Sequence, residues 1–95
     1  MIVKVSATPT FERAVKKLHD RDRKTINTAI REIMAEPKIG KGKKGDLAGV
    51  FVHKFKVNKQ EILLSYKLIG PEDSPDELVL LAIGSHENLY RDLKR

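Results

Sequence analysis

The first third of the chain shows one strand pattern and two helical patterns. In residues 1–7, MIVKVSA, odd and even positions alternate in the manner of a strand. Thr8 then offers an N-cap hydroxyl, and Pro9 suits the first position of a helix, where its missing N–H costs nothing. The sequence therefore predicts a first strand that leads directly into a helix.

Two apolar stripes at helical spacing follow. The first stripe consists of Phe11, Ala14, Val15 and Leu18. The second consists of Ile26, Ile30, Ile33 and Met34. We expect the first helix to end near His19–Asp20, and the second to run from an N-cap at Asp22 to about Glu36, because Pro37 stops it. These short amphipathic helices predict an antiparallel hairpin that needs a sheet to cover its stripes.

The second half of the chain reads as a loop followed by a meander. Residues 37–49, PKIGKGKKGDLAG, are predicted to be a loop, because lysines and glycines leave little to pack. Strand patterns follow at 50–57, 61–69 and 78–83, and their short connections favour antiparallel pairing. The order predicts a single α+β domain over residues 1–95. It has an N-terminal strand, an antiparallel two-helix hairpin on one face of a mostly antiparallel four-stranded sheet, and a short C-terminal helical segment.

Side chains along a strand alternate between faces, so each strand can be divided. In the 50–57 strand, the side with Phe51, His53 and Phe55 is predicted to meet the helices, which leaves Lys54 and Lys56 on the opposite side. His53 is expected to be a histidine at the edge of the core rather than a ligand. Lysines at exposed strand positions also serve simply to keep a sheet soluble.

The last strand ends at a histidine. If this strand is regular, one side carries Leu78, Leu80, Ala82, Gly84 and His86. Whether His86 shares a face with the two lysines depends on strand register, which the sequence leaves open.

Composition narrows the class of protein. Apolar residues make up 40% of the 95 residues and aromatics 5%, so the core is expected to consist mainly of Val, Ile and Leu. The absence of cysteine excludes disulfides, a thiolate nucleophile and a Cys-based metal site. No segment has the pattern of a membrane span or a signal peptide, so we expect a cytoplasmic protein. Neither a metal nor a cofactor site is predicted, because GKGKKG lacks the context of a phosphate-binding loop.

The charge is positive and unevenly distributed. The net charge is +6, and residues 1–44 contain 12 Lys or Arg against 5 Asp or Glu. This asymmetry favours a polyanionic partner, either a nucleic acid or an acidic protein, over a merely solvated surface.

Three segments behind the helical hairpin resemble the RelE/ParE superfamily of bacterial type II toxins. They are GDLAGVFVHKFKV, ILLSYKL and LLAIGSHENLYRDLKR, in this order. The resemblance covers essentially the whole chain and implies the fold described above. RelE-like members are metal-independent endoribonucleases that cut mRNA on the ribosome, whereas ParE-like members inhibit DNA gyrase. The resemblance also implies a cognate antitoxin with an acidic, partly disordered segment.

For the RelE-like activity, the resemblance implies a set of catalytic residues. They are His86, Lys54, Lys56, Tyr90 and Arg91. Lys54 and Lys56 match the basic pair of the nucleases, and His86 follows the last strand where those enzymes place a basic or histidine side chain. This sequence departs from the RelE pattern at Leu63, the position expected to align with an arginine in the middle strand of RelE proper.

The chemistry requires a base, an acid and cations. The 2′-hydroxyl of the RNA attacks the adjacent phosphorus, so His86 suits the acid or base role, and the lysines suit charge stabilisation. Arg91 would add a phosphate contact and Tyr90 would stack on a base. A footprint on ribosomal RNA is predicted for Lys38, Lys41, Lys43, Lys44, Arg21, Arg23 and Lys24.

Two other readings remain open. In one, the chain is a gyrase-directed toxin that acts by protein–protein binding alone; in the other, it is an inactive relative that binds only its antitoxin. The tail likewise has a structural reading, in which Leu89 and Leu93 seat a short helix and leave Tyr90 and Arg91 on an ordinary surface.

Overall fold

The computed structural model describes residues 2–43, 45, 49–71 and 73–85. These residues form two helices and one five-stranded sheet in the order β1-β5-β4-β3-β2. The strands are β1 (Lys4–Ala7), β2 (Lys41–Gly42), β3 (Val50–Val57), β4 (Gln60–Ile69) and β5 (Glu77–Gly84). Every neighbouring pair is antiparallel except β1 with β5, which is parallel. The predicted α+β class and the mostly antiparallel sheet are confirmed.

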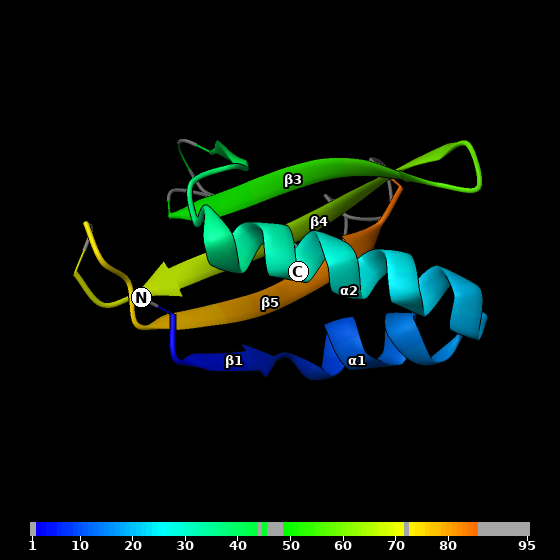
Figure 1. Cartoon of the computed structure of the whole chain (residues 1–95), viewed down its shortest axis with the longest axis horizontal. Helices are drawn as coiled ribbons and strands as arrows, with labels where there is room; N and C mark the ends of the chain where they lie inside the picture. Colours follow the sequence, from blue (N-terminus) through cyan, green and yellow to red (C-terminus); the bar gives the residue numbers. More distant parts are fainter. Residues whose placement is uncertain (1, 44, 46–48, 72, 86–95) are drawn as a thin grey trace.

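Both helices lie on the same face of the sheet. Helix α1 (Pro9–Lys16) follows directly from β1, and α2 (Asp20–Ala35) crosses in front of the central strands (Figure 1). Phe11, Ile26 and Ile33 are buried, as their spacing predicts, and they pack in one cluster with Leu64 and Leu78 of the sheet. The sheet therefore covers the helix stripes except at Met34, which was predicted to belong to the second stripe but is exposed. The sheet's other face is left without helices over residues 2–43, 45, 49–71 and 73–85.

Capping explains where α1 begins and ends. The Thr8 hydroxyl accepts a hydrogen bond from the Phe11 N–H at 3.2 Å, with Pro9 in the first turn, as predicted. The helix ends at Lys16, earlier than expected, and the Arg23 guanidinium donates hydrogen bonds to the carbonyl oxygens of Val15 and Lys16 at this end.

The start of α2 differs from the prediction. The helix begins at Asp20, and His19 occupies the N-cap position without a side-chain hydrogen bond. The predicted cap at Asp22 is wrong, because Asp22 lies inside the first turn and is buried. Its Oδ1 accepts a hydrogen bond from Asn58 Nδ2 at 3.0 Å, so this carboxylate joins the helix to the β3–β4 turn.

The sheet gains a fifth strand that the sequence pattern does not reveal. Lys41 and Gly42 pair with Val52 and Phe51 of β3, inside the segment predicted to be a loop. Nothing in the side chains of this lysine and glycine indicates a strand, because the pairing uses only the backbone. The strand-like segment therefore brings the lysine-rich loop alongside β3.

The last strand is not regular. The β4–β5 register shifts between Ser65 and Tyr66, so that Ser65 pairs with Ala82 and Tyr66 with Leu80, which leaves Leu81 as a bulge. Leu78 and Leu80 therefore lie on the helix face, whereas Ala82 and Gly84 lie on the opposite face. The expectation that these four residues share one side is wrong for this reason. The bulge also sends Ile83 into the main core.

Candidate functional site

The sheet face opposite the helices carries a group of lysines, which we call the lysine face. Cross-strand partners point to the same side of a sheet, so the register assigns each residue to a face. Lys54 and Lys56 are exposed on this face of β3, as predicted, and Lys41 of β2 joins them because it pairs with Val52. Lys67 of β4 is also exposed there, opposite Val50. The lysine face thus draws on three strands and consists of Lys41, Lys54, Lys56 and Lys67.

Strand register relates the end of β5 to Lys54. Lys54 pairs with Leu63, and Leu63 pairs with Gly84, so the three residues form one row across β3, β4 and β5. Two strand spacings separate the ends of the row, which places Lys54 about 10 Å from Gly84 between Cα atoms. The last residues of β5 therefore lie on the lysine face rather than on the helix face.

Between the lysines, the centre of this face is apolar. Val52, Leu63 and Ala82 form a second cluster of buried residues, and Leu63 is 1% exposed. Ser65 is also buried and donates its hydroxyl hydrogen bond to the Ala82 carbonyl oxygen at 3.2 Å. Leu63, which was expected to align with an arginine of RelE, is thus a packing residue here.

Tyr66 holds the lysine-rich loop from the other side of the sheet. Its hydroxyl donates to the Pro37 carbonyl oxygen at 2.8 Å and accepts from the Gly40 N–H at 3.0 Å. The ring is fully buried and stacks on Phe51, with centroids 5.5 Å apart. Burial raises the pKa of the Tyr66 hydroxyl, and the hydrogen bond from Gly40 lowers it by a smaller amount. The loop before Lys41 is therefore fixed to the middle strand.

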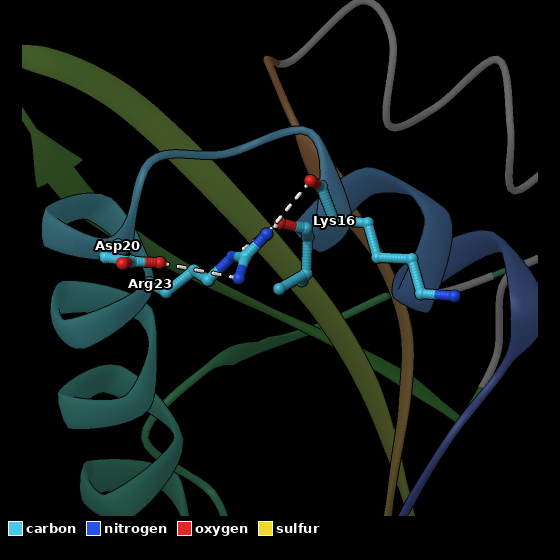
Figure 2. Close-up of polar contacts among 4 residues, drawn as sticks. Lys16, Asp20 and Arg23 are labelled. Carbon is cyan, nitrogen blue, oxygen red and sulfur yellow. Dashed lines mark hydrogen bonds and ion pairs between the residues drawn. The ribbon is translucent and has the colours of Figure 1, made fainter.

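A second basic group, predicted as part of the RNA footprint, lies in the helix layer. Arg21 and Lys24 are exposed in the first turns of α2. Arg23 donates to the Lys16 carbonyl oxygen at 2.9 Å and pairs with Asp20 at 3.5 Å, so it ties the two helices together (Figure 2). The sheet separates this group from Lys54 and Lys56, so the predicted footprint falls into two regions.

The remaining predicted residues divide into two sets. Lys38 is exposed in the loop after α2, and the N–H of Lys43 donates to the Val50 carbonyl oxygen at 2.8 Å as an extension of β2. Lys44, His86, Tyr90 and Arg91 lie outside the described residues. His86 is joined to Gly84 through Ser85 alone.

His53 lies at the edge of the core, as expected. It is partly buried on the helix face of β3, and its ring stacks on Phe55 with centroids 5.8 Å apart. Its Nε2 is buried and has no hydrogen-bond partner among the residues that the structure describes. His53 therefore points away from the lysine face and does not contribute a side chain to it.

Sequence reasoning missed a cavity at the base of the helical hairpin. The cavity has a volume of about 150 Å³, with Leu18, Ile26 and Ile62 among its apolar lining. Asp22 and Asn58 form its polar edge. Asn58 occupies the left-handed region at φ 52°, which suits the two-residue turn between β3 and β4. The helix pattern alone places Asp22 at a cap, so only the fold reveals this contact.

Among the described residues, no group of three or more His, Cys, Asp or Glu side chains is placed to hold a metal ion. Within the same ranges, neither helix is long and apolar enough to cross a bilayer.

Comparison with known families decides the classification. The model of the ParE-like toxins of type II bacterial toxin–antitoxin systems matches residues 5–94. The chain belongs to this toxin family. No match was found among curated proteins.

Solved structures support the same fold. An E. coli RelE toxin in the free state, with two arginines replaced by alanine, superposes with a TM-score of 0.72 at 18% identity and covers 99% of this chain and 96% of its own. The intact E. coli RelBE toxin–antitoxin complex gives a TM-score of 0.64 at 17% identity, over 85% and 93%. The toxin therefore has a RelE-like fold.

Proposed function

We propose that this toxin is a metal-independent, ribosome-dependent mRNA endoribonuclease that inhibits translation in the cytoplasm. The observation that carries the proposal is the lysine face: Lys54 and Lys56 are exposed at alternate positions of β3, and Lys41 shares their face. Three ammonium groups on one rigid sheet suit a phosphate whose charge increases as the 2′-hydroxyl oxygen attacks the phosphorus. The lysines stabilise that charge without rearranging the protein.

A nuclease of this type also needs an acid and a base. The 2′-hydroxyl loses its proton to the base as the new P–O bond forms, and the 5′-oxygen gains a proton from the acid as its P–O bond breaks, which leaves a cyclic phosphate. His86 is assigned the acid or base role, with Lys54 or Lys56 as the second group. The row from Lys54 to Gly84 supports this assignment, because β5 ends on the lysine face two residues before His86.

The other catalytic and binding assignments fall in more than one region of the molecule. Tyr90 and Arg91 are proposed to contact a base and a phosphate. The exposed Lys38, Arg21 and Lys24 are proposed to contact ribosomal RNA. In this reading, Arg23 contributes through its effect on the helical hairpin, because its guanidinium is already bound to α1 carbonyl oxygens.

The partner that neutralises the toxin is proposed to be a cognate antitoxin. The solved E. coli RelBE structure is a toxin–antitoxin complex, and this chain has the corresponding fold. A net charge of +6 favours an antitoxin with an acidic segment.

Gyrase inhibition is the second candidate. The observation that favours it is the buried Leu63, which lies between Lys54 and Gly84 in the row across the sheet. A nuclease would gain from a cation at this position, and Leu63 is apolar.

The test is a purified translation reaction on a defined mRNA, with primer extension to locate breaks. Wild-type protein is compared with His86→Ala, with the Lys54→Ala/Lys56→Ala double variant and with Lys59→Ala, a lysine of the β3–β4 turn that serves as the control. We expect ribosome-dependent breaks with wild type and Lys59→Ala, and a loss of at least about 100-fold in the other two. Intact mRNA together with inhibited DNA supercoiling by gyrase would establish the alternative.

A further inference from the structure

A carboxylate also lies on the lysine face, beside the basic pair. Glu61 of β4 pairs with Lys56 of β3, so the two side chains point to the same side of the sheet, with their Cα atoms about 5 Å apart. Glu61 is exposed. It is two residues from Leu63 along the strand, which places its Cα about 7 Å from the row that joins Lys54 to Gly84. The carboxylate is therefore a neighbour of both the lysines and the end of β5.

Glu61 differs from the other carboxylate on this face. In the described strands, Glu77 is the second acidic residue that points to this side, because it pairs with Ile69, which shares a side with Lys67. Glu77 lies at the far end of the sheet and accepts a hydrogen bond from Ser6 Oγ at 2.8 Å. The side chain of Glu61 forms no hydrogen bond or ion pair within the described ranges. Its carboxylate oxygens can therefore accept a proton from a ligand.

RNA cleavage requires a group that accepts a proton, and a protonated lysine cannot do so. An ammonium group has three donors and no lone pair, whereas an ionised carboxylate has only acceptors. An exposed lysine ordinarily keeps its proton near neutral pH, and an exposed carboxylate does not. The 2′-hydroxyl is next to the phosphorus that it attacks, so the base and the cation that serve them have to be neighbours. Glu61 and Lys56 meet this requirement, because they are direct cross-strand partners.

We propose that Glu61 is the general base of the cleavage reaction. Its carboxylate takes the proton of the 2′-hydroxyl as the bond between the 2′-oxygen and the phosphorus forms. The bond between the phosphorus and the 5′-oxygen breaks, and protonated His86 donates its proton to the 5′-oxygen. The products are a 2′,3′-cyclic phosphate and a 5′-hydroxyl, after which Glu61 releases its proton to water and His86 takes one up. The inference rests on the proposed function and assigns its second proton-transfer group to Glu61, which leaves both lysines as cations.

An electrostatic reading gives Glu61 a different role, in which it only offsets the charge of Lys56. Oppositely charged cross-strand neighbours stabilise exposed sheets. In that case, removal of the carboxylate would strengthen RNA binding and would not slow cleavage, since a phosphate-binding surface would lose one negative charge. Loss of a general base has the opposite effect on the rate, because the RNA still binds and the chemical step is slower. The direction of the change in rate therefore separates the two roles.

The test measures single-turnover cleavage of a defined mRNA on purified ribosomes. Glu61→Gln keeps the shape of the side chain and removes the proton acceptor. Glu77→Gln removes the same charge from the same face and is the matched control. We expect Glu61→Gln to slow cleavage by about 100-fold or more, with ribosome affinity within about threefold of wild type, and Glu77→Gln to slow cleavage by less than about threefold. Thermal unfolding of each free variant verifies that the fold is retained.

A substrate with sulfur in place of the 5′-oxygen identifies the step in which Glu61 acts. A thiolate leaves without a proton, so this substrate restores cleavage to a variant that lacks the acid and not to one that lacks the base. We expect it to restore cleavage by His86→Ala and not by Glu61→Gln. Rescue of Glu61→Gln by this substrate would overturn the proposal, and so would cleavage of the ordinary mRNA by Glu61→Gln at the wild-type rate or faster.

The wild-type protein separates this inference from the proposed function. Ribosome-dependent breaks that are unaffected by Glu61→Gln would refute the role of Glu61 alone. An absence of breaks with wild-type protein would refute the proposed function, and the role of Glu61 with it.

Discussion

The N–H of Gly40 donates to the Tyr66 hydroxyl at 3.0 Å, across 26 positions of the chain. The same hydroxyl donates to the Pro37 carbonyl oxygen, so one buried side chain of β4 holds both ends of a short loop. This loop leads directly into Lys41 of β2, which pairs with Val52. The position of one lysine on the lysine face is therefore set by a tyrosine on the opposite face of the sheet.

Removing the Tyr66 hydroxyl is expected to destabilise the fold. In Tyr66→Phe, the Gly40 N–H and the Pro37 carbonyl oxygen lose their shared partner while the ring remains, so we expect a loss of about 1–3 kcal/mol in the free energy of unfolding. Urea unfolding measures this change. Thr28→Ala removes an exposed hydroxyl that bonds within its own helix, and it should change stability by less than about 0.5 kcal/mol. Equal stability of wild type and Tyr66→Phe would show that the loop is held by other contacts.

The same residue predicts a dependence of stability on alkaline pH. Burial raises the pKa of Tyr66 in the folded state above its ordinary value of 10.0. Tyr66 therefore stays protonated in the folded state while it ionises in the unfolded state, and its contribution to stability is present below pH 10 and lost as the pH rises through the folded pKa. Wild type should lose more stability than Tyr66→Phe between about pH 9 and pH 11. Parallel pH profiles of the two proteins would contradict this assignment, because the two proteins differ only in the Tyr66 hydroxyl.

Two glycines of the same segment should respond differently to alanine. A Cβ on Gly40 would lie 2.7 Å from the Tyr66 hydroxyl oxygen and 3.1 Å from the backbone carbon of Val52. A Cβ on Gly42 would meet the Phe51 ring at 3.6 Å, an ordinary contact. We expect Gly40→Ala to cost about 1–3 kcal/mol of stability and Gly42→Ala to change it by less than about 1 kcal/mol. Thermal unfolding compares the pair, and a larger loss for Gly42→Ala would mean that β2 is positioned differently.

Asp22 and Asn58 should be energetically coupled. Their hydrogen bond joins α2 to the β3–β4 turn, and the carboxylate is buried. In a double-mutant cycle of Asp22→Ala and Asn58→Gly, we expect a coupling energy of about 1–2 kcal/mol. Glycine is chosen at position 58 because it tolerates the positive φ of Asn58. Additive effects within about 0.3 kcal/mol would mean that the contact does not join the two elements in solution.

The lysine face predicts the salt dependence of RNA binding. Single-stranded RNA that contacts Lys41, Lys54 and Lys56 releases counterions, so each lysine-to-alanine change should reduce the slope of log affinity against log salt by about 0.7. Lys59→Ala on the β3–β4 turn is the matched control and should leave the slope unchanged. A uniform reduction for all four variants would point to diffuse charge rather than to this face.

Elements with strong side-chain patterns were predictable from the sequence. The strand at 50–57 agrees with β3 at both ends, and Pro37 marks the end of α2 to within a residue. β2 was not predictable, because the pairing of Lys41 and Gly42 depends on the neighbouring strand and not on their own side chains. The cap of α2 was placed wrongly because Asp22 is used in a contact with Asn58, 36 positions away.

The candidate site was predictable only where it depends on the alternation of side chains along one strand. The exposure of Lys54 and Lys56 followed from alternation with Phe51 and Phe55. That Lys41 and Lys67 lie on the same face follows from the register between strands, which no local sequence pattern determines. The roles of His86, Tyr90 and Arg91 stay predictions, since these residues lie outside the described ranges.

The bulge at Leu81 is joined to the start of α1. Thr8, which caps α1, also donates its hydroxyl hydrogen bond to the Leu81 carbonyl oxygen at 2.6 Å. Removing one residue from this part of β5 would restore a regular strand and reverse the side to which each later residue points. In a relative that lacks the extra residue, an identical residue aligned after position 81 would then lie on the opposite face of the sheet. Equivalent side chains in this segment are therefore identified by superposing the structures rather than by aligning the sequences.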